Sequence, residues 1–121
     1  MKSERVGKLE RTKLFALRII RLYSSLPKTT EAQVIGKQLL RSGTSVGGQV
    51  REGNRSRSDA EMISKTEGAL QELEETMYWL QLLADAGILK AERLADLLNE
   101  ADELTAILVT SVKTLKSRRN K

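Results

Sequence analysis

Apolar residues recur along most of the chain at steps of three and four, the period of helices that bury one face. The clearest run predicts a helix over about residues 58–86: Met62, Thr66, Ala69, Leu70, Leu73, Met77, Leu80 and Ala84. A second run predicts a helix over about residues 90–117: Leu94, Leu97, Leu98, Ala101, Leu104, Leu108, Val112 and Leu115. The second half of the chain is therefore predicted to form two long helices.

Local signals mark where these two helices begin and end. Ser58 followed by Glu61 forms a Ser-x-x-Glu capping box, which starts a helix. Gly87 is a natural C-cap, after which the chain can turn back quickly. The chain closes with a basic segment, residues 116–121, whose positive charge suits the negative end of a helix dipole. We expect this tail to fray.

The first half predicts two more helices, over about residues 8–25 and 30–54. Pro27 separates them, and Thr29 or Thr30 can cap the second. The first helix carries two apolar stripes; one is Leu14, Leu17, Ile20 and Tyr23, and the other is Phe15, Ile19, Leu22 and Leu26. One stripe suffices for a four-helix monomer, so the second indicates a subunit partner.

Three glycines interrupt the predicted helix over residues 30–54: Gly43, Gly47 and Gly48. Each costs about 1 kcal/mol relative to alanine inside a helix. One interpretation is a groove of small residues where another helix approaches closely. The other is a break at Gly47 and Gly48. We favour the continuous helix because the apolar period from Leu39 to Val50 keeps its register.

Four helices with short connections predict an all-α fold, an up-and-down antiparallel four-helix bundle. The 121 residues fit one domain, residues 1–121, with 40% hydrophobic and 31% charged residues. At this size a large share of the apolar surface stays in contact with water unless the chain oligomerises.

The composition argues against catalysis. The chain has no cysteine and no histidine, so it lacks thiol chemistry, the commonest general base and the commonest metal ligand. We expect no enzyme, no cofactor and no metal. Glu67 and Glu74, seven residues apart, are the carboxylate pair to examine, because Glu67 lies close to the apolar seam. The stretch GTSVGG lacks the Gly-Lys-Ser/Thr ending of a phosphate loop. Arg18 and Arg21 interrupt the first apolar run, so we expect a soluble, untargeted cytoplasmic protein without a membrane span.

Positive charge is concentrated in the first half of the chain. Residues 1–60 hold 13 Lys and Arg against 5 Asp and Glu, whereas residues 61–121 hold 8 against 11. Arginines dense on one helix end can neutralise phosphates. The candidate nucleic-acid-binding residues are Arg41, Arg51, Arg55 and Arg57, with Arg18 and Arg21 on the first helix. The alternative is that these arginines pair with the acidic second half, and Glu52 already lies among them.

Several residues in the middle of the chain resemble the bacterial four-helix bundle proteins encoded in intervening sequences of 23S ribosomal RNA genes. The family pattern joins Arg-Ser, small residues and Ser-Val-Gly to a later Glu-x-x-Glu-Thr-x-Tyr-Trp-Leu. The resemblance spans about residues 12–112, and the usual Asn after the small residues is replaced by Gln49. The matching positions are Arg41, Ser42, Ser45, Val46, Gly47, Glu52, Ser58, Lys65, Glu72, Glu75, Thr76, Tyr78, Trp79 and Leu80.

The resemblance implies a homopentameric ring with a basic surface that contacts nucleic acid. The chain also looks distantly like the accessory variability proteins of diversity-generating retroelements, which associate with a reverse transcriptase and RNA. The leading hypothesis is a non-enzymatic ring that binds RNA or DNA, as accessory to a structured RNA or a reverse transcriptase. The alternative is a protein-interaction or scaffold module that binds no nucleic acid.

Overall fold

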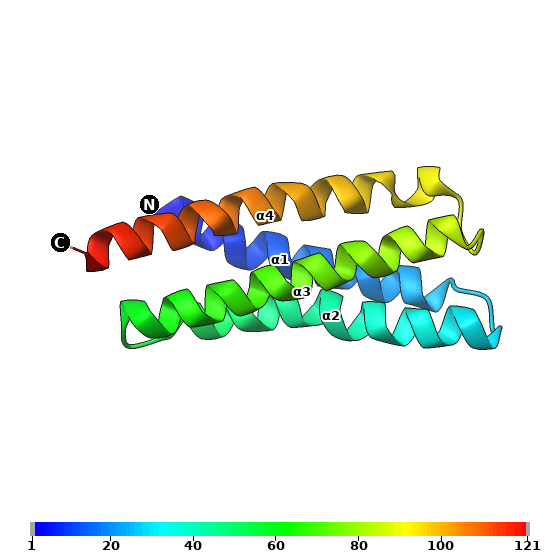
Figure 1. The fold of residues 1–121 in the computed structure, drawn as a ribbon, viewed down its shortest axis with the longest axis horizontal. Coiled ribbons are helices and arrows are strands. Elements are labelled where there is room, and N and C mark those ends of the chain that lie inside the picture. Colours follow the sequence, from blue (N-terminus) through cyan, green and yellow to red (C-terminus); the bar gives the residue numbers. More distant parts are fainter. Residues whose placement is uncertain (1, 121) are drawn as a thin grey trace.

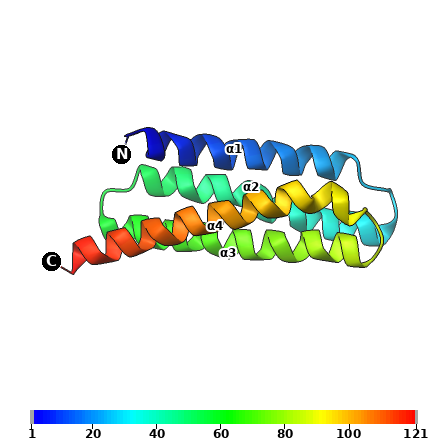
Figure 2. The ribbon, with the colours of Figure 1, turned by 90° about the horizontal axis from the view of Figure 1, so that it is seen from above.

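Four long helices form an up-and-down bundle in a computed structural model that describes residues 2–120, with side chains from residue 7 (Figure 1). They are α1 (Lys2–Ser24), α2 (Thr30–Asn54), α3 (Asp59–Asp85) and α4 (Ala91–Arg119). Each helix packs against the next in the chain, and α1 touches α4 only lightly. The backbones of α1 and α3 lie diagonally across the bundle and do not approach each other closely (Figure 2). The predicted all-α bundle is confirmed.

The ends of the helices lie close to the predicted bounds, apart from the start of α1, which begins at Lys2 and not near Lys8. Thr29 is the N-cap of α2, and its side chain accepts a hydrogen bond from the Ala32 amide. Ser58 caps α3 by accepting from the Glu61 amide at 3.1 Å. Both caps satisfy amides that a helix start leaves without partners.

The end of α3 has the geometry of a Schellman motif. Gly87 has a φ of 73°, which only glycine adopts without strain. The Ile88 amide donates to the Leu83 carbonyl at 3.0 Å, and the Gly87 amide donates to the Ala84 carbonyl at 3.0 Å. Ile88 then packs against the core. The predicted C-cap at Gly87 is confirmed.

The main core takes one stripe of each helix, and a second, smaller cluster of Ile63, Val112 and Leu115 lies between the start of α3 and the end of α4. In α1 this is the stripe that begins with Phe15, which is fully buried. The other predicted stripe of α1 is largely exposed. Each helix contributes several buried apolar side chains, among them Ile19, Leu39, Val46, Leu73, Leu80, Leu83, Leu94, Leu104 and Leu108.

The helix α2 is continuous through its glycines, as the apolar period predicted. A Cβ built on Gly43 would lie 2.8 Å from Ile19 Cγ1, so the missing side chain lets α1 approach closely. Gly47 lies against the Thr12 backbone, whereas a Cβ on Gly48 would meet nothing within 4 Å. The glycines therefore serve two purposes: Gly43 allows close packing, and Gly48 keeps the surface beside it open.

Candidate nucleic-acid interface

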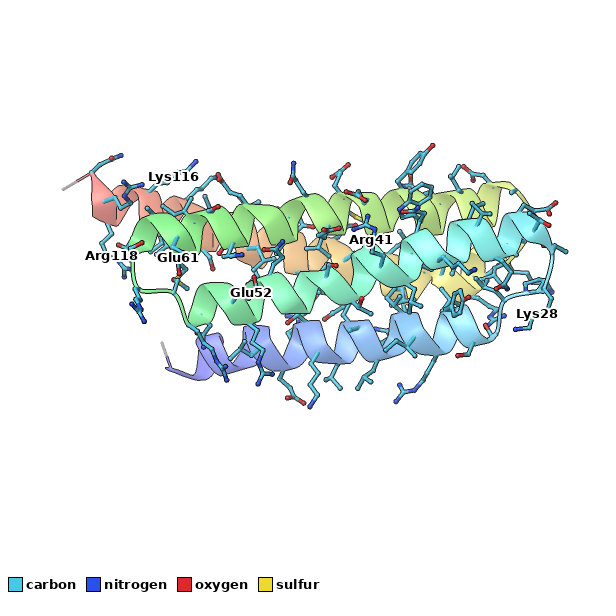
Figure 3. All side chains as sticks on the ribbon, turned by 90° about the horizontal axis from the view of Figure 1, so that it is seen from below. Lys28, Arg41, Glu52, Glu61, Lys116 and Arg118 are labelled. Carbon is cyan, nitrogen blue, oxygen red and sulfur yellow. The ribbon has the colours of Figure 1, made fainter. Side chains whose placement is uncertain are left out.

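The structure distributes the six candidate arginines over different surfaces. Arg41 lies across the α2–α3 boundary, where its guanidinium bonds Glu72 at 3.3 Å and Glu75 at 2.5 Å (Figure 3). Two carboxylates therefore balance its charge. The pairing of basic and acidic halves, expected as an alternative, is present at this position.

The acidic residue expected among the other arginines turns away from them. Glu52 bonds Lys65 Nζ at 2.8 Å, across the α2–α3 boundary. This hydrogen bond with Glu52 raises the pKa of Lys65. The side chains of Arg51 and Arg55 are exposed, and neither forms an ion pair within the part of the chain that the structure describes. Their positive charge is left for the surface on the other side of α2.

That surface is a groove of about 460 Å³ between α1 and α2. Arg51 and Arg55 line it from α2, and Lys13 lines it from α1. Among the side chains that the structure describes, Glu10 is the single acidic residue in the lining, which gives the rim three positive charges and one negative. The remaining lining residues are small, apolar or uncharged polar: Leu9, Thr12, Ala16, Thr44, Gly47, Gly48 and Asn54.

The floor of this groove is shallow because small residues from both helices meet there. Gly47 and Gly48 have no side chains, and Ala16 faces them from α1. Any side chain at Gly48 would project into open space. A ligand can thus approach the helix backbone while cations surround it, an arrangement suited to a phosphate chain.

The other candidates lie outside the groove. Arg57 lies in the α2–α3 turn and is exposed. The helix α1 lines the groove only between Leu9 and Ala16, so Arg18 and Arg21 are beyond it. Sequence reasoning missed Lys13, which joins Arg51 and Arg55 only through the packing of α1 on α2. Its signal is weak: Lys13 lies one helical turn before Leu17 on an otherwise apolar face.

Acidic residues elsewhere form no site. Glu67 bonds Lys116 Nζ at 3.1 Å, and both it and Glu74 line a second, mixed-charge groove on α3. Among residues 7–120, whose side chains the structure describes, no group of three or more carboxylates could hold a metal ion. The GTSVGG stretch is helical, so its amides are engaged in the helix. None of the helices over the same residues has an apolar stretch long enough to span a bilayer.

Comparison with known proteins places the chain in a family. Residues 7–110 match the family described as 23S rRNA-intervening sequence protein. A crystal structure from Bacteroides thetaiotaomicron, described as a protein of unknown function from the S23 ribosomal protein family, has 34% sequence identity and a TM-score of 0.86. The match covers 91% of this chain and 98% of the other. No curated protein sequence matches. Since the matched segment spans most of the bundle, the chain belongs to the 23S rRNA-intervening sequence protein family.

Proposed function

We propose that the protein binds the phosphate backbone of RNA or DNA through the α1–α2 groove, as a homo-oligomer that catalyses no reaction. One observation carries this proposal: Glu52 pairs with Lys65, which leaves Arg51 and Arg55 unneutralised beside Lys13. Cations without protein partners can exchange their counterions for phosphates, and this release drives binding.

The groove supports recognition of the backbone more than recognition of bases. Its charged groups are flexible side chains at an open rim, and its floor offers glycine and alanine. Such a surface positions a phosphate chain without reading its sequence. We therefore expect weak sequence preference. Arg57 adds an exposed positive charge in the α2–α3 turn, outside the groove, whereas Arg41 contributes little because its charge is balanced.

The resemblance to accessory variability proteins extends the proposal to a partner. In this extension the chain assists a structured RNA or a reverse transcriptase, as a ring of identical subunits, a pentamer by the same resemblance. The rival function is a protein-interaction module whose groove receives an acidic segment of another protein. The two functions differ in what the purified protein retains near physiological salt.

The deciding experiment measures fluorescence anisotropy of labelled structured RNA and duplex DNA over a salt series. We expect binding that weakens steeply with salt. The double variant Arg51→Ala/Arg55→Ala should bind more weakly, and its log–log salt slope should fall by about 2, roughly one unit per lost phosphate contact. Arg41→Ala is the matched control, because it removes the same type of charge from a paired position.

Two results contradict the proposal. The first is no binding by the unaltered protein near physiological salt, which favours the protein-interaction module. The second is equal loss in the Arg41→Ala control, which places the binding surface elsewhere. Pull-downs with the unaltered protein and the double variant then identify whether an acidic protein occupies the groove.

A further inference from the structure

The outer face of α1 is apolar and has no partner in the bundle. Leu14 is 49% exposed, Leu17 36% and Ile20 41%. They follow one another at steps of three, so they share the side of α1 opposite the buried Phe15 stripe. Arg21 lies one turn after Leu17 on the same side and is exposed. We call Leu14, Leu17, Ile20 and Arg21 the α1 face.

The outer face of α3 carries an exposed aromatic residue among acidic and polar ones. Tyr78 is 55% exposed, and its ring lies against that of Trp79, with centroids 5.1 Å apart. Glu74 lies one turn before Tyr78 on the same side and is exposed. Glu74 forms no ion pair among the described residues, whereas Glu75 forms an ion pair with Arg41. We call Gln71, Glu74 and Tyr78 the α3 face.

These two faces point away from each other, because α1 and α3 are diagonal in the bundle (Figure 2). One copy therefore cannot cover its own faces. A two-fold contact of α1 on α1, centred on Leu17, would bring Lys13 of each copy toward Arg21 of the other, and like charges oppose it. A contact between different faces avoids this, since Arg21 then meets the free carboxylate of Glu74.

We infer that the α1 face of one copy packs against the α3 face of a second copy. Leu17 and Ile20 cover the ring of Tyr78, and Arg21 pairs with Glu74. The inference rests on the self-association in the proposed function and gives it a geometry. Such a head-to-tail contact uses each face once per copy, and it closes into a ring if the rotation between copies permits.

Complementation between two variants tests this arrangement. Leu17→Glu/Ile20→Glu removes the α1 face and leaves the α3 face intact. Glu74→Lys/Tyr78→Lys does the reverse. All four side chains are exposed, so the bundle does not depend on them. Light scattering should give an oligomer for the unaltered protein and the 13.5 kDa monomer for each variant. An equimolar mixture should contain a 1:1 complex of twice that mass, joined by the one remaining pair of intact faces.

Other outcomes overturn the inference. If the α3-face variant still self-associates, the α3 face is not part of the contact; if the mixture stays monomeric, the faces do not meet. A monomeric unaltered protein also overturns it. Val34→Glu is the control, since Val34 is 59% exposed but lies on α2 outside both faces, and it should keep the oligomer. If Arg51→Ala/Arg55→Ala loses nucleic-acid binding but keeps the oligomer mass of the unaltered protein, the binding proposal and the assembly proposal are tested independently.

Discussion

The hydroxyl oxygens of Ser42 and Thr76 lie 2.9 Å apart in the α2–α3 interface, where both side chains are fully buried. Each also lies within hydrogen-bonding distance of a carbonyl of its own helix: Ser42 of Leu39 at 3.3 Å, and Thr76 of Glu72 at 2.7 Å. Every hydroxyl proton therefore has an acceptor. This polar pair links two helices inside a largely apolar core.

A double-mutant cycle should reveal the coupling of these two hydroxyls. Ser42→Ala and Thr76→Val should each lower the free energy of unfolding by about 1 kcal/mol, the net value of a buried hydrogen bond. The double variant should lose less than the sum, by about 1 kcal/mol, because the two changes remove the same bond. Urea denaturation followed by circular dichroism measures all four proteins. Strict additivity would show that the hydroxyls do not interact.

Two alanine substitutions in α2 should have opposite effects. Gly43→Ala forces a methyl group against Ile19, and overpacking costs about 1–3 kcal/mol. This cost exceeds the stabilisation that the higher helix propensity of alanine provides. Gly48→Ala meets open space, so it should stabilise the protein by about 0.5–1 kcal/mol. Thermal unfolding of both variants beside the unaltered protein tests the contrast. A stabilising Gly43→Ala would mean that α1 and α2 are not in close contact there.

The ion pair of Asp59 and Arg118 should make the stability of the fold depend on pH in the acidic range. Arg118 donates two hydrogen bonds to Asp59, at 2.6 and 2.9 Å, and these lower the pKa of Asp59 (Figure 3). A lowered pKa stabilises the fold above the ordinary carboxyl range, and this contribution is lost as pH falls through the folded value.

Asp59→Asn should therefore lower the Tm slightly at neutral pH. The difference should shrink as pH falls below the ordinary carboxyl range and vanish once the folded carboxyl is protonated. The effect is small because the pair is exposed. Asp102→Asn is the control, since Asp102 is exposed and forms no ion pair among the described residues. A Tm difference for Asp59→Asn that persists unchanged at acid pH contradicts this assignment.

Arg11 should hold α1 to α4. Its guanidinium donates to Glu100 at 2.7 and 3.0 Å and to Glu103 at 2.8 Å, and the hydrogen bonds to Glu100 contribute most to raising the pKa of Arg11. Because α1 contacts α4 only lightly, Arg11→Ala should loosen α1 locally. We expect a loss of about 1 kcal/mol, seen as about fivefold faster amide exchange in α1.

Arg41→Ala provides the comparison, because Arg41 joins α2 to α3 and its loss should leave exchange in α1 unchanged. Hydrogen exchange read by mass spectrometry resolves the helices separately. Equal acceleration in α3 and α1 after Arg11→Ala would indicate a global loss of stability, which contradicts a local role.

Features that depend on neighbouring residues could be predicted from the sequence. Ser58 and Gly87 fix their helix ends through bonds to residues no more than five positions away. The apolar period from Leu39 to Val50 likewise predicted a continuous α2. The start of α1 was missed because Lys2 and the residues after it lack an apolar period, although several are good helix formers.

The candidate site could be predicted only in part, because its electrostatics depend on how the helices are rotated against each other. Arg41 and Arg51 look alike in the sequence, ten positions apart on the same helix. Packing turns Arg41 toward two carboxylates more than thirty positions away and leaves Arg51 beside Lys13. No local signal distinguishes these two environments.

The small residues of α2 also fix the lengthwise position of α1. Gly36 receives Tyr23 and Leu26, and Gly43 receives Ile19. Sliding α1 by one turn would move Tyr23 from Gly36 to the level of Ala32 or Leu40, and both of these residues carry side chains. The position of Lys13 relative to Arg51 along the bundle is thus set by close contacts at Gly36 and Gly43, which lie outside the groove. The groove is preorganised, so the phosphate chain that we propose as its ligand would not have to provide the free energy to assemble it.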